Sequence, residues 1–333
     1  MSVDLVEKPS PSTTTPSSQA AALTVKPLTP ILGAEVGGID LRQELDAQTA
    51  VRVREALLAH KVLVFRDQPL TDDEQIRFSR IFGKVTPAHP ITNGLPDQPA
   101  IMQNVKSVMT SRVNELDAVA RQQLRANSKG RRLRGWHTDI TFVANPTSVT
   151  ILRGLEIPDG AGDTAWVDLE ALYAALSPAF QQLVDGLTAV HGRDDARIGY
   201  TPQPRDDGRT TGPFLSEHAL VRIHPETGRK SLFVNPVFLK YIPDLTDAEG
   251  AALLDYLFEE QAGRIDLQVR VQWRTNDIVV WDNRNTSHWG PLDEIHFAAE
   301  RIVRRTTVDP EYTTGPTGFR SRQIVGEPFY TLD

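Results

Sequence analysis

The stretch Gly135–Phe142, which reads GWHTDITF, places an imidazole, His137, two residues before a carboxylate, Asp139. On an extended strand, the side chains at positions i and i+2 point to the same face. We therefore expect an extended strand on which His137 and Asp139 hold one metal ion from one edge. The alternative is that the pair is structural, because His-x-Asp also arises by chance.

His288 is the candidate third ligand. It ends the segment Asp282–His288, which reads DNRNTSH and follows an apolar strand. Two histidines and one carboxylate form the facial triad of non-haem Fe(II) enzymes, which leaves about three octahedral positions open for a co-substrate and O2. Neutral imidazoles and one anionic carboxylate suit Fe(II), so the sequence predicts an iron site.

Two further segments follow these ligands at spacings that match a known family. Asp163–Trp166 (DTAW) follows His137, and Arg301–Arg305 (RIVRR) follows His288. Together with the metal motif, they make the chain resemble the taurine/2-oxoglutarate dioxygenase (TauD/TfdA) family, and in particular its alkylsulfatase and sulfate ester dioxygenase members. The resemblance covers nearly all of the chain outside its N-terminal tail.

The resemblance implies how the co-substrate is bound. His137, Asp139 and His288 would hold Fe(II), to which 2-oxoglutarate and O2 bind. The distal carboxylate of 2-oxoglutarate needs a planar cation, and Arg301 fits because a guanidinium matches a carboxylate bidentately. Thr164 resembles the hydroxyl residue with which the family contacts the same molecule. The alternatives are an ordinary ion pair for Arg301 and a turn residue for Thr164.

Three residues are candidates for contacting the substrate. Arg305 lies where sulfonate- and sulfate-using relatives place a substrate-contacting arginine, so we expect an anionic substrate. In the family a histidine near His89 faces the substrate, and Phe142 is a candidate for lining an apolar channel. The alternatives are a loop position beside Pro90 for His89 and a core position for Phe142.

The implied reaction converts 2-oxoglutarate and O2 to succinate and CO2 while an unactivated C–H bond is hydroxylated. Hydroxylation beside a sulfate ester or a sulfonate gives an unstable adduct that releases an aldehyde and the inorganic anion. One alternative is hydroxylation, desaturation or a related oxidation of a specialised metabolite, because the segments before Trp136 and after His288 are longer than the family pattern. Alternatives from other classes are a Zn(II)-dependent hydrolase and a non-catalytic jelly-roll metal-binding protein.

Composition limits the partners. The chain of 333 residues has a net charge of −7 and no cysteine. The negative charge argues against a nucleic-acid partner, and the lack of cysteine excludes disulfides and fits a reducing cytoplasm. No apolar run approaches the roughly 20 residues that span a bilayer, and no signal peptide is recognisable. A small-molecule substrate is the expected partner, and a homo-oligomer is left open.

The organisation of the chain predicts a mainly β fold with flanking α-helices, a double-stranded β-helix or jelly roll. Residues 1–23 are rich in Ser, Thr, Pro and Ala and are expected to form a disordered tail. Residues 24–333 are expected to form a single dioxygenase domain. Within it, residues 105–134 form a basic, lid-like insertion that would attract an anionic substrate, or a merely solvated lid. Residues 192–216 form a second polar loop.

Helix signals and apolar runs locate the regular elements. Capping boxes open helices at Thr71 and Thr246, and Ser177 followed by a proline opens another. The expected helices span 46–60, 71 to about 82, 168–176, 177–187 and 246 to about 261. The chain becomes strand-like from Thr24, and residues 28–41 resemble the opening hairpin of the family. The expected strands span 61–66, 146–156, 217–223, 230–235, 267–273, 277–281 and 302–308, and a turn is expected over 160–164.

Overall fold

The structure is a computed structural model that describes residues 23–106, 135–193, 204–290 and 300–333. Residues 1–22 of the predicted tail and most of the basic insertion therefore lie outside the described residues, and so does the middle of the second loop. Leu23, the last residue of the predicted tail, packs against the core. That loop is shorter at both ends than predicted, because the flanking strands reach Arg193 and begin again at Phe214. At the other insertion, residues 105 and 106 belong to a strand.

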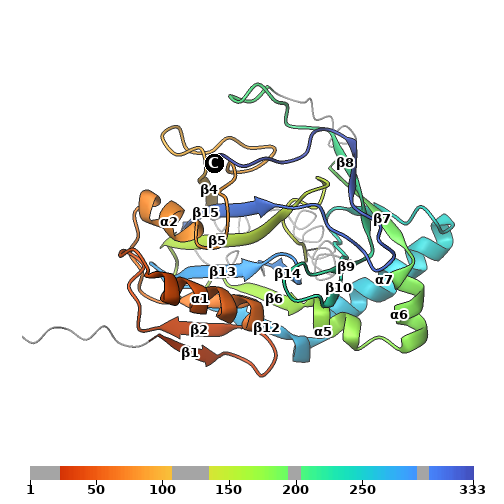
Figure 1. The fold of residues 1–333 in the computed structure, drawn as a ribbon, viewed down its shortest axis with the longest axis horizontal. Helices are drawn as coiled ribbons and strands as arrows, with labels where there is room; N and C mark the ends of the chain where they lie inside the picture. Colours follow the sequence, from red (N-terminus) through yellow and green to blue (C-terminus); the bar gives the residue numbers. More distant parts are fainter. Residues whose placement is uncertain (1–22, 107–134, 194–203, 291–299) are drawn as a thin grey trace, which may run out of the picture.

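A seven-stranded sheet forms the larger of the two main layers (Figure 1). Its neighbours pair antiparallel except β2 and β3, which pair parallel. In spatial order the strands are β1 (Thr24–Pro27), β2 (Ala34–Gly37), β3 (Val62–Phe65), β13 (Ile278–Asp282), β5 (Thr147–Glu156), β15 (Arg301–Pro310) and β4 (Met102–Lys106).

Three smaller sheets complete the β structure. A three-stranded sheet packs against the large one and contains β12 (Gln268–Val271), β6 (Thr164–Asp168) and β14 (Thr286–Trp289). A four-stranded sheet contains β11 (Leu239–Tyr241), β7 (Thr188–Arg193), β8 (Phe214–Ala219) and β16 (Arg322–Val325). The hairpin of β9 (Val221–Ile223) and β10 (Lys230–Leu232) lies beside them.

Alternating side chains on β3 separate two cores, because successive residues of a strand face opposite sides. Leu63 and Phe65 join an apolar cluster with α1 and α2 on one face of the large sheet. Val62 and Val64 join the cluster between this sheet and β6–β12. There the rings of Trp166 and Trp281 meet at 5.6 Å. This packing of two sheets with helices outside is the predicted jelly roll.

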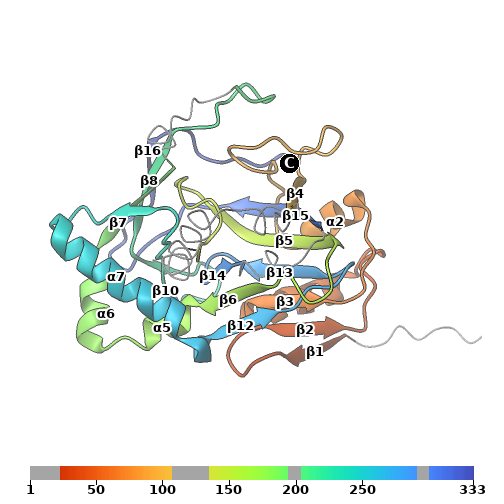
Figure 2. The same ribbon diagram turned by 180° about the vertical axis from the view of Figure 1, so that it is seen from behind.

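The helices confirm the predicted start signals. They are α1 (Ala47–His60), α2 (Asp72–Ser79), α5 (Leu169–Ala174), α6 (Pro178–Asp185) and α7 (Asp247–Gly263). Figure 2 shows α5, α6 and α7 gathered at one end of the molecule. Both capping boxes are present. Within the described ranges, no helix combines the length and the apolar character needed to cross a membrane.

Several predicted boundaries are wrong. The strand predicted over 217–223 is interrupted at Leu220, and the one predicted over 230–235 ends at Leu232. Helix α2 ends at Ser79 rather than near Phe82. After Ser79, the backbone N–H groups of residues 80–82 donate to the carbonyl three residues earlier, as in a 3-10 helix. The Ser79 hydroxyl lies 2.6 Å from Thr306 Oγ1 on β15. The turn predicted over residues 160–164 ends one residue early, because Thr164 already pairs with Val271 as the first residue of β6.

Candidate active site

The three predicted metal ligands come together between the two main sheets. One ligand atom from each of His137, Asp139 and His288 lies within 4.8 Å of the others. His137 N donates to His288 O at 2.8 Å, and His288 N donates to His137 O at 2.7 Å. This reciprocal pair sets the two imidazoles side by side, with 4.1 Å between ring centroids.

The predicted extended strand through His137 and Asp139 is wrong. His137 makes a single bridge to His288, and the chain then turns, with Ile140 at φ 46°. Side chains hold this turn. The Thr138 hydroxyl donates to Thr286 O at 2.9 Å, and Asn235 Nδ2 donates to Thr138 O at 2.9 Å. Turn geometry, rather than strand alternation, brings Asp139 to the histidines.

Hydrogen bonding and burial leave both imidazoles ready to bind a metal. His137 Nδ1 lies 3.1 Å from Gly135 O. A carbonyl only accepts, so Nδ1 carries the proton and Nε2 is left for a metal. His288 Nε2 lies 3.9 Å from Asp139 Oδ1. Burial, helped by the neighbouring His137, lowers the pKa of His288 to about 3. His288 is therefore neutral, the form that binds metals.

Asp139 is held at both carboxylate oxygens. Oδ2 accepts a hydrogen bond from Thr150 Oγ1 at 2.7 Å, and Oδ1 accepts one from Arg305 Nη1 at 3.1 Å. Burial alone would raise the pKa of this carboxyl, but the Arg305 guanidinium, together with the hydrogen bond from Thr150, holds it well below its usual value. Two imidazoles beside an ionised carboxylate are a donor set that fits Fe(II).

The ligands open onto one cavity of about 150 Å³. Its wall carries the predicted co-substrate residues and one predicted substrate residue. The lining comprises Asn104, His137, Asp139, Leu152, Gly162, Asp163, Thr164, Trp281, His288, Gly290, Arg301, Val303 and Arg305. The structure thus brings together the metal ligands, Thr164, Arg301 and Arg305.

Close packing orients Arg301 and Thr164. Arg301 Nε donates to Gly162 O at 3.1 Å. A Cβ at position 162 would lie 2.6 Å from Arg301 Cδ, and Gly162 has φ +78°, so this position requires glycine. Thr164 Oγ1 accepts from Trp273 Nε1 at 3.0 Å and keeps its own proton to donate. The Trp273 ring also lies 5.6 Å from Arg301 Cζ.

Known proteins share this sequence and fold. The model of the taurine catabolism dioxygenase TauD, TfdA family matches residues 24–307. The chain belongs to this family. It is therefore a 2-oxoglutarate-dependent dioxygenase, which disfavours the hydrolase and non-catalytic alternatives.

Individual relatives agree with this assignment. The dioxygenase is 36% identical to an alkylsulfatase of Acinetobacter baylyi, over 90% of this chain and 89% of the relative. It is 31% identical to an alpha-ketoglutarate-dependent sulfate ester dioxygenase of Pseudomonas putida, over 91% and 95% of the two chains. A taurine dioxygenase structure from Burkholderia xenovorans superposes with a TM-score of 0.76 at 36% identity, covering 92% of this chain and 96% of that one.

Asn104 is a cavity residue that the sequence analysis missed. It lies on β4 directly opposite Val303 of β15. On β15, residues 301, 303 and 305 share one face, so Asn104 stands between the two cavity arginines. The sequence offered only a partial signal for Asn104, because the last residues of β4 fall within the segment 105–134, which was interpreted as a lid.

His89 and Phe142 do not line the cavity of the dioxygenase. His89 is buried, accepts a hydrogen bond from Ile91 N at 3.2 Å, and lies 6.1 Å from the Phe142 ring. Phe142 is fully buried and meets the rings of Phe214 at 5.4 Å and Phe238 at 5.0 Å. Neither residue is part of the lining of the cavity among the described residues, and a contact of either with the substrate stays a prediction.

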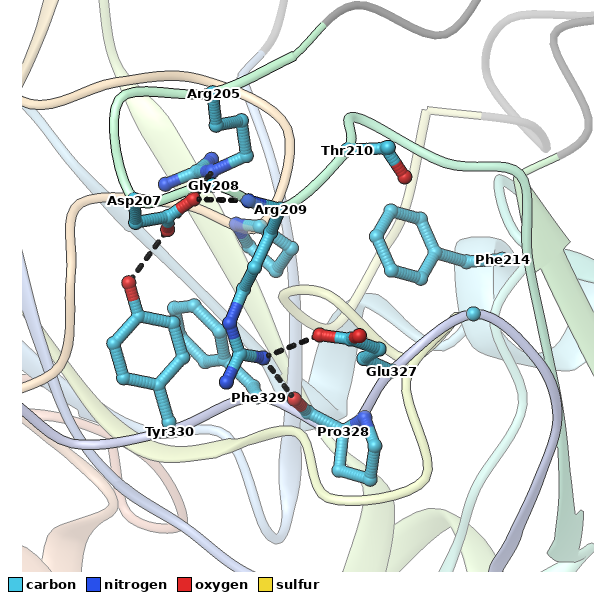
Figure 3. A pocket seen from close by; sticks show the side chains of 12 residues that line it. Arg205, Asp207, Gly208, Arg209, Thr210, Phe214, Glu327, Pro328, Phe329 and Tyr330 are labelled. Carbon is cyan, nitrogen blue, oxygen red and sulfur yellow. Dashed lines mark hydrogen bonds and ion pairs between the residues drawn. The ribbon is translucent and has the colours of Figure 1, made fainter.

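A second cavity, of about 130 Å³, lies between the loop 205–210 and the segment 326–330 (Figure 3). Its charges are paired. Arg209 lies 3.1 Å from Glu327 Oε2, and the Tyr330 hydroxyl donates to Asp207 at 2.6 Å. Arg205 connects it to the active site, because it donates to His89 O while Arg305 Nη2 donates to the preceding carbonyl, Ala88 O.

Proposed function

We propose that the dioxygenase binds Fe(II) through His137 Nε2, Asp139 Oδ1 and His288 Nε2 and oxidises a small organic anion, a sulfate ester or a sulfonate. The observation that carries this proposal is that the three ligand atoms and two arginines of β15 open onto one cavity. Iron supplies the activation of O2 when it is bound. The residues around it bind and orient the co-substrate and the substrate, and they exclude water.

The co-substrate follows from charge and position. A divalent metal with one carboxylate ligand has a net charge of about +1, which favours the 2-oxoglutarate dianion. Its keto and C1 carboxylate oxygens suit the open metal positions. We assign its distal carboxylate to Arg301, whose guanidinium the Gly162 carbonyl and the Trp273 ring orient. The Thr164 hydroxyl provides a second donor for the same carboxylate.

The substrate class rests on Arg305. Its Nη1 contacts Asp139, and its Nη2 contacts Ala88 O and Met102 Sδ. Arg305 lines the cavity, and Nη1 carries a second N–H besides the one given to Asp139, which can donate to a bound anion. The names of the alkylsulfatase and sulfate ester dioxygenase relatives support the same class. They favour it over a specialised metabolite.

The chemistry balances without another reductant. One atom of O2 enters succinate as 2-oxoglutarate loses CO2, and the other becomes the hydroxyl on the carbon that bears the sulfate oxygen. The C–O bond to sulfate then breaks and leaves an aldehyde and inorganic sulfate. Leu152 and Val303 form an apolar part of the cavity wall and limit the access of water to the reacting carbon.

The test is succinate release by Fe(II)-loaded protein supplied with 2-oxoglutarate and O2. The panel contains alkyl sulfates, taurine and other sulfonates, aryloxy acids and larger neutral metabolites. Stimulation by a sulfate or sulfonate, with one sulfate or sulfite released per succinate, supports the proposal. Stimulation only by a neutral metabolite would overturn the substrate class. No succinate from any mixture would overturn the assigned site.

A further inference from the structure

Three residues behind Asp139 form a chain of hydrogen bonds that ends on its carboxylate. Thr150 lies on β5, Trp281 lies on β13, and Asn283 lies in the connection to β14. All three are buried. We propose that this chain, the Trp281–Asn283–Thr150 relay, positions Asp139 and thereby sets metal affinity. The proposal rests on the metal site proposed above.

The direction of every hydrogen bond in the relay is determined. An indole N–H can only donate, so the Asn283 atom 3.1 Å from Trp281 Nε1 is the oxygen Oδ1. The amide nitrogen Nδ2 must then donate to Thr150 Oγ1 at 2.8 Å. Having accepted that bond, the hydroxyl donates to Asp139 Oδ2 at 2.7 Å. The ionised carboxylate can only accept, so both ends of the relay require the same direction.

The middle residue of the relay is fixed on several sides. Asn283 N donates to Ser148 O at 2.8 Å, and Arg222 donates to the Asn283 carbonyl. Asn283 Oδ1 lies 3.4 Å from Asp139 N, close enough for a weak second contact with the ligand residue. The oxygen and the nitrogen of this buried side-chain amide both have hydrogen-bond partners. Rotating the amide by 180° would leave its partners unpaired, so its orientation is fixed.

The relay connects two of the three metal ligands. The Trp281 ring that starts it also packs against the His288 ring, with 4.8 Å between centroids. Thr150 occupies Oδ2, so Oδ1, shared with Arg305, is the oxygen that faces the histidines. With Oδ2 hydrogen-bonded to Thr150, Asp139 would hold a metal through Oδ1.

Replacing Thr150 with Val tests the relay, because it removes the hydroxyl and keeps the side-chain shape. Co(II) is the probe, and its dissociation constant is measured by calorimetry on metal-free protein without co-substrate. We expect Thr150→Val to raise that constant roughly 10-fold to 100-fold and to change the visible spectrum of bound Co(II). Thr150→Ser restores the hydroxyl and should recover wild-type affinity.

Thr147→Val is the matched control. Thr147 lies on the same strand and is equally buried, but among the described residues its hydroxyl has no hydrogen-bond partner. If Thr150→Val fails to fold, Asn283→Ala, which removes the donor to Thr150, serves as the second variant. Co(II) binding unchanged in a folded variant would overturn the relay. A wild-type protein that does not bind Co(II) would overturn the metal site itself.

Discussion

Arg305 Nη1 donates a hydrogen bond to Asp139 Oδ1 across 3.1 Å, so one arginine of β15 contacts both a metal ligand and the cavity. The guanidinium helps to keep the carboxyl ionised in a buried site. A bound anionic substrate at Arg305 would therefore meet the same cation that holds the metal ligand. We therefore expect metal binding and substrate binding to be coupled through this residue.

Replacing Arg305 with Gln is expected to weaken both functions. A hydrogen bond to a charged group contributes about 1.5–3 kcal/mol, so the KM for a sulfate ester should rise roughly 10-fold to 100-fold. The Co(II) dissociation constant should rise as well, because the pKa of Asp139 would increase. Arg304→Gln is the control, since Arg304 pairs with Asp72 outside the cavity. An unchanged KM in the Arg305 variant would make that residue purely structural.

Replacing Arg301 with Ala is expected to act on the co-substrate. The KM for 2-oxoglutarate should rise roughly 10-fold to 100-fold, and Co(II) binding without co-substrate should change less. Gly162→Ala should act in the same direction, because its Cβ would collide with Arg301. The measurement is succinate release against 2-oxoglutarate concentration. Wild-type KM in both variants would show that the distal carboxylate binds elsewhere.

Local interactions explain which features were predictable from the sequence. The capping boxes at Thr71 and Thr246 involve residues three positions apart, so the sequence alone locates those helix starts. The candidate metal ligands His137, Asp139 and His288 stand in a recognisable sequence pattern, and the structure brings them together. The family resemblance supplied Thr164 and Arg301, which the structure places in the same cavity.

Long-range interactions explain the rest. The turn at Asp139 is held by Thr286 and by Asn235, which lies 97 positions from Thr138. No local sequence pattern encodes such contacts. The alternation of side chains on a strand therefore predicted the wrong backbone conformation at His137 and Asp139. Asn104 became visible only once β4 was seen to pair with β15.

The metal-free protein should lose stability as the pH falls below about 6.5. Burial lowers the pKa of His218 from 6.5 to about 3 and that of His191 well below its usual value. Between pH 6.5 and 3 the unfolded chain binds protons that these buried imidazoles do not, so the free energy of unfolding decreases with acidification. Urea unfolding at several pH values tests this. His218→Gln should flatten the slope, and a pH-independent free energy would contradict it.

Replacing Asn104 with Asp should weaken the binding of both anions. Asn104 lines the cavity opposite Val303, between the positions of Arg301 and Arg305. A carboxylate there would repel 2-oxoglutarate and a sulfate ester, so both KM values should rise, by roughly 5-fold or more at low salt. Gln103→Glu is the matched control, because the neighbouring side chain is exposed and contacts Arg304. Equal effects of the two variants would indicate a general charge effect, whereas a rise confined to the Asn104 variant would place both anions beside that residue.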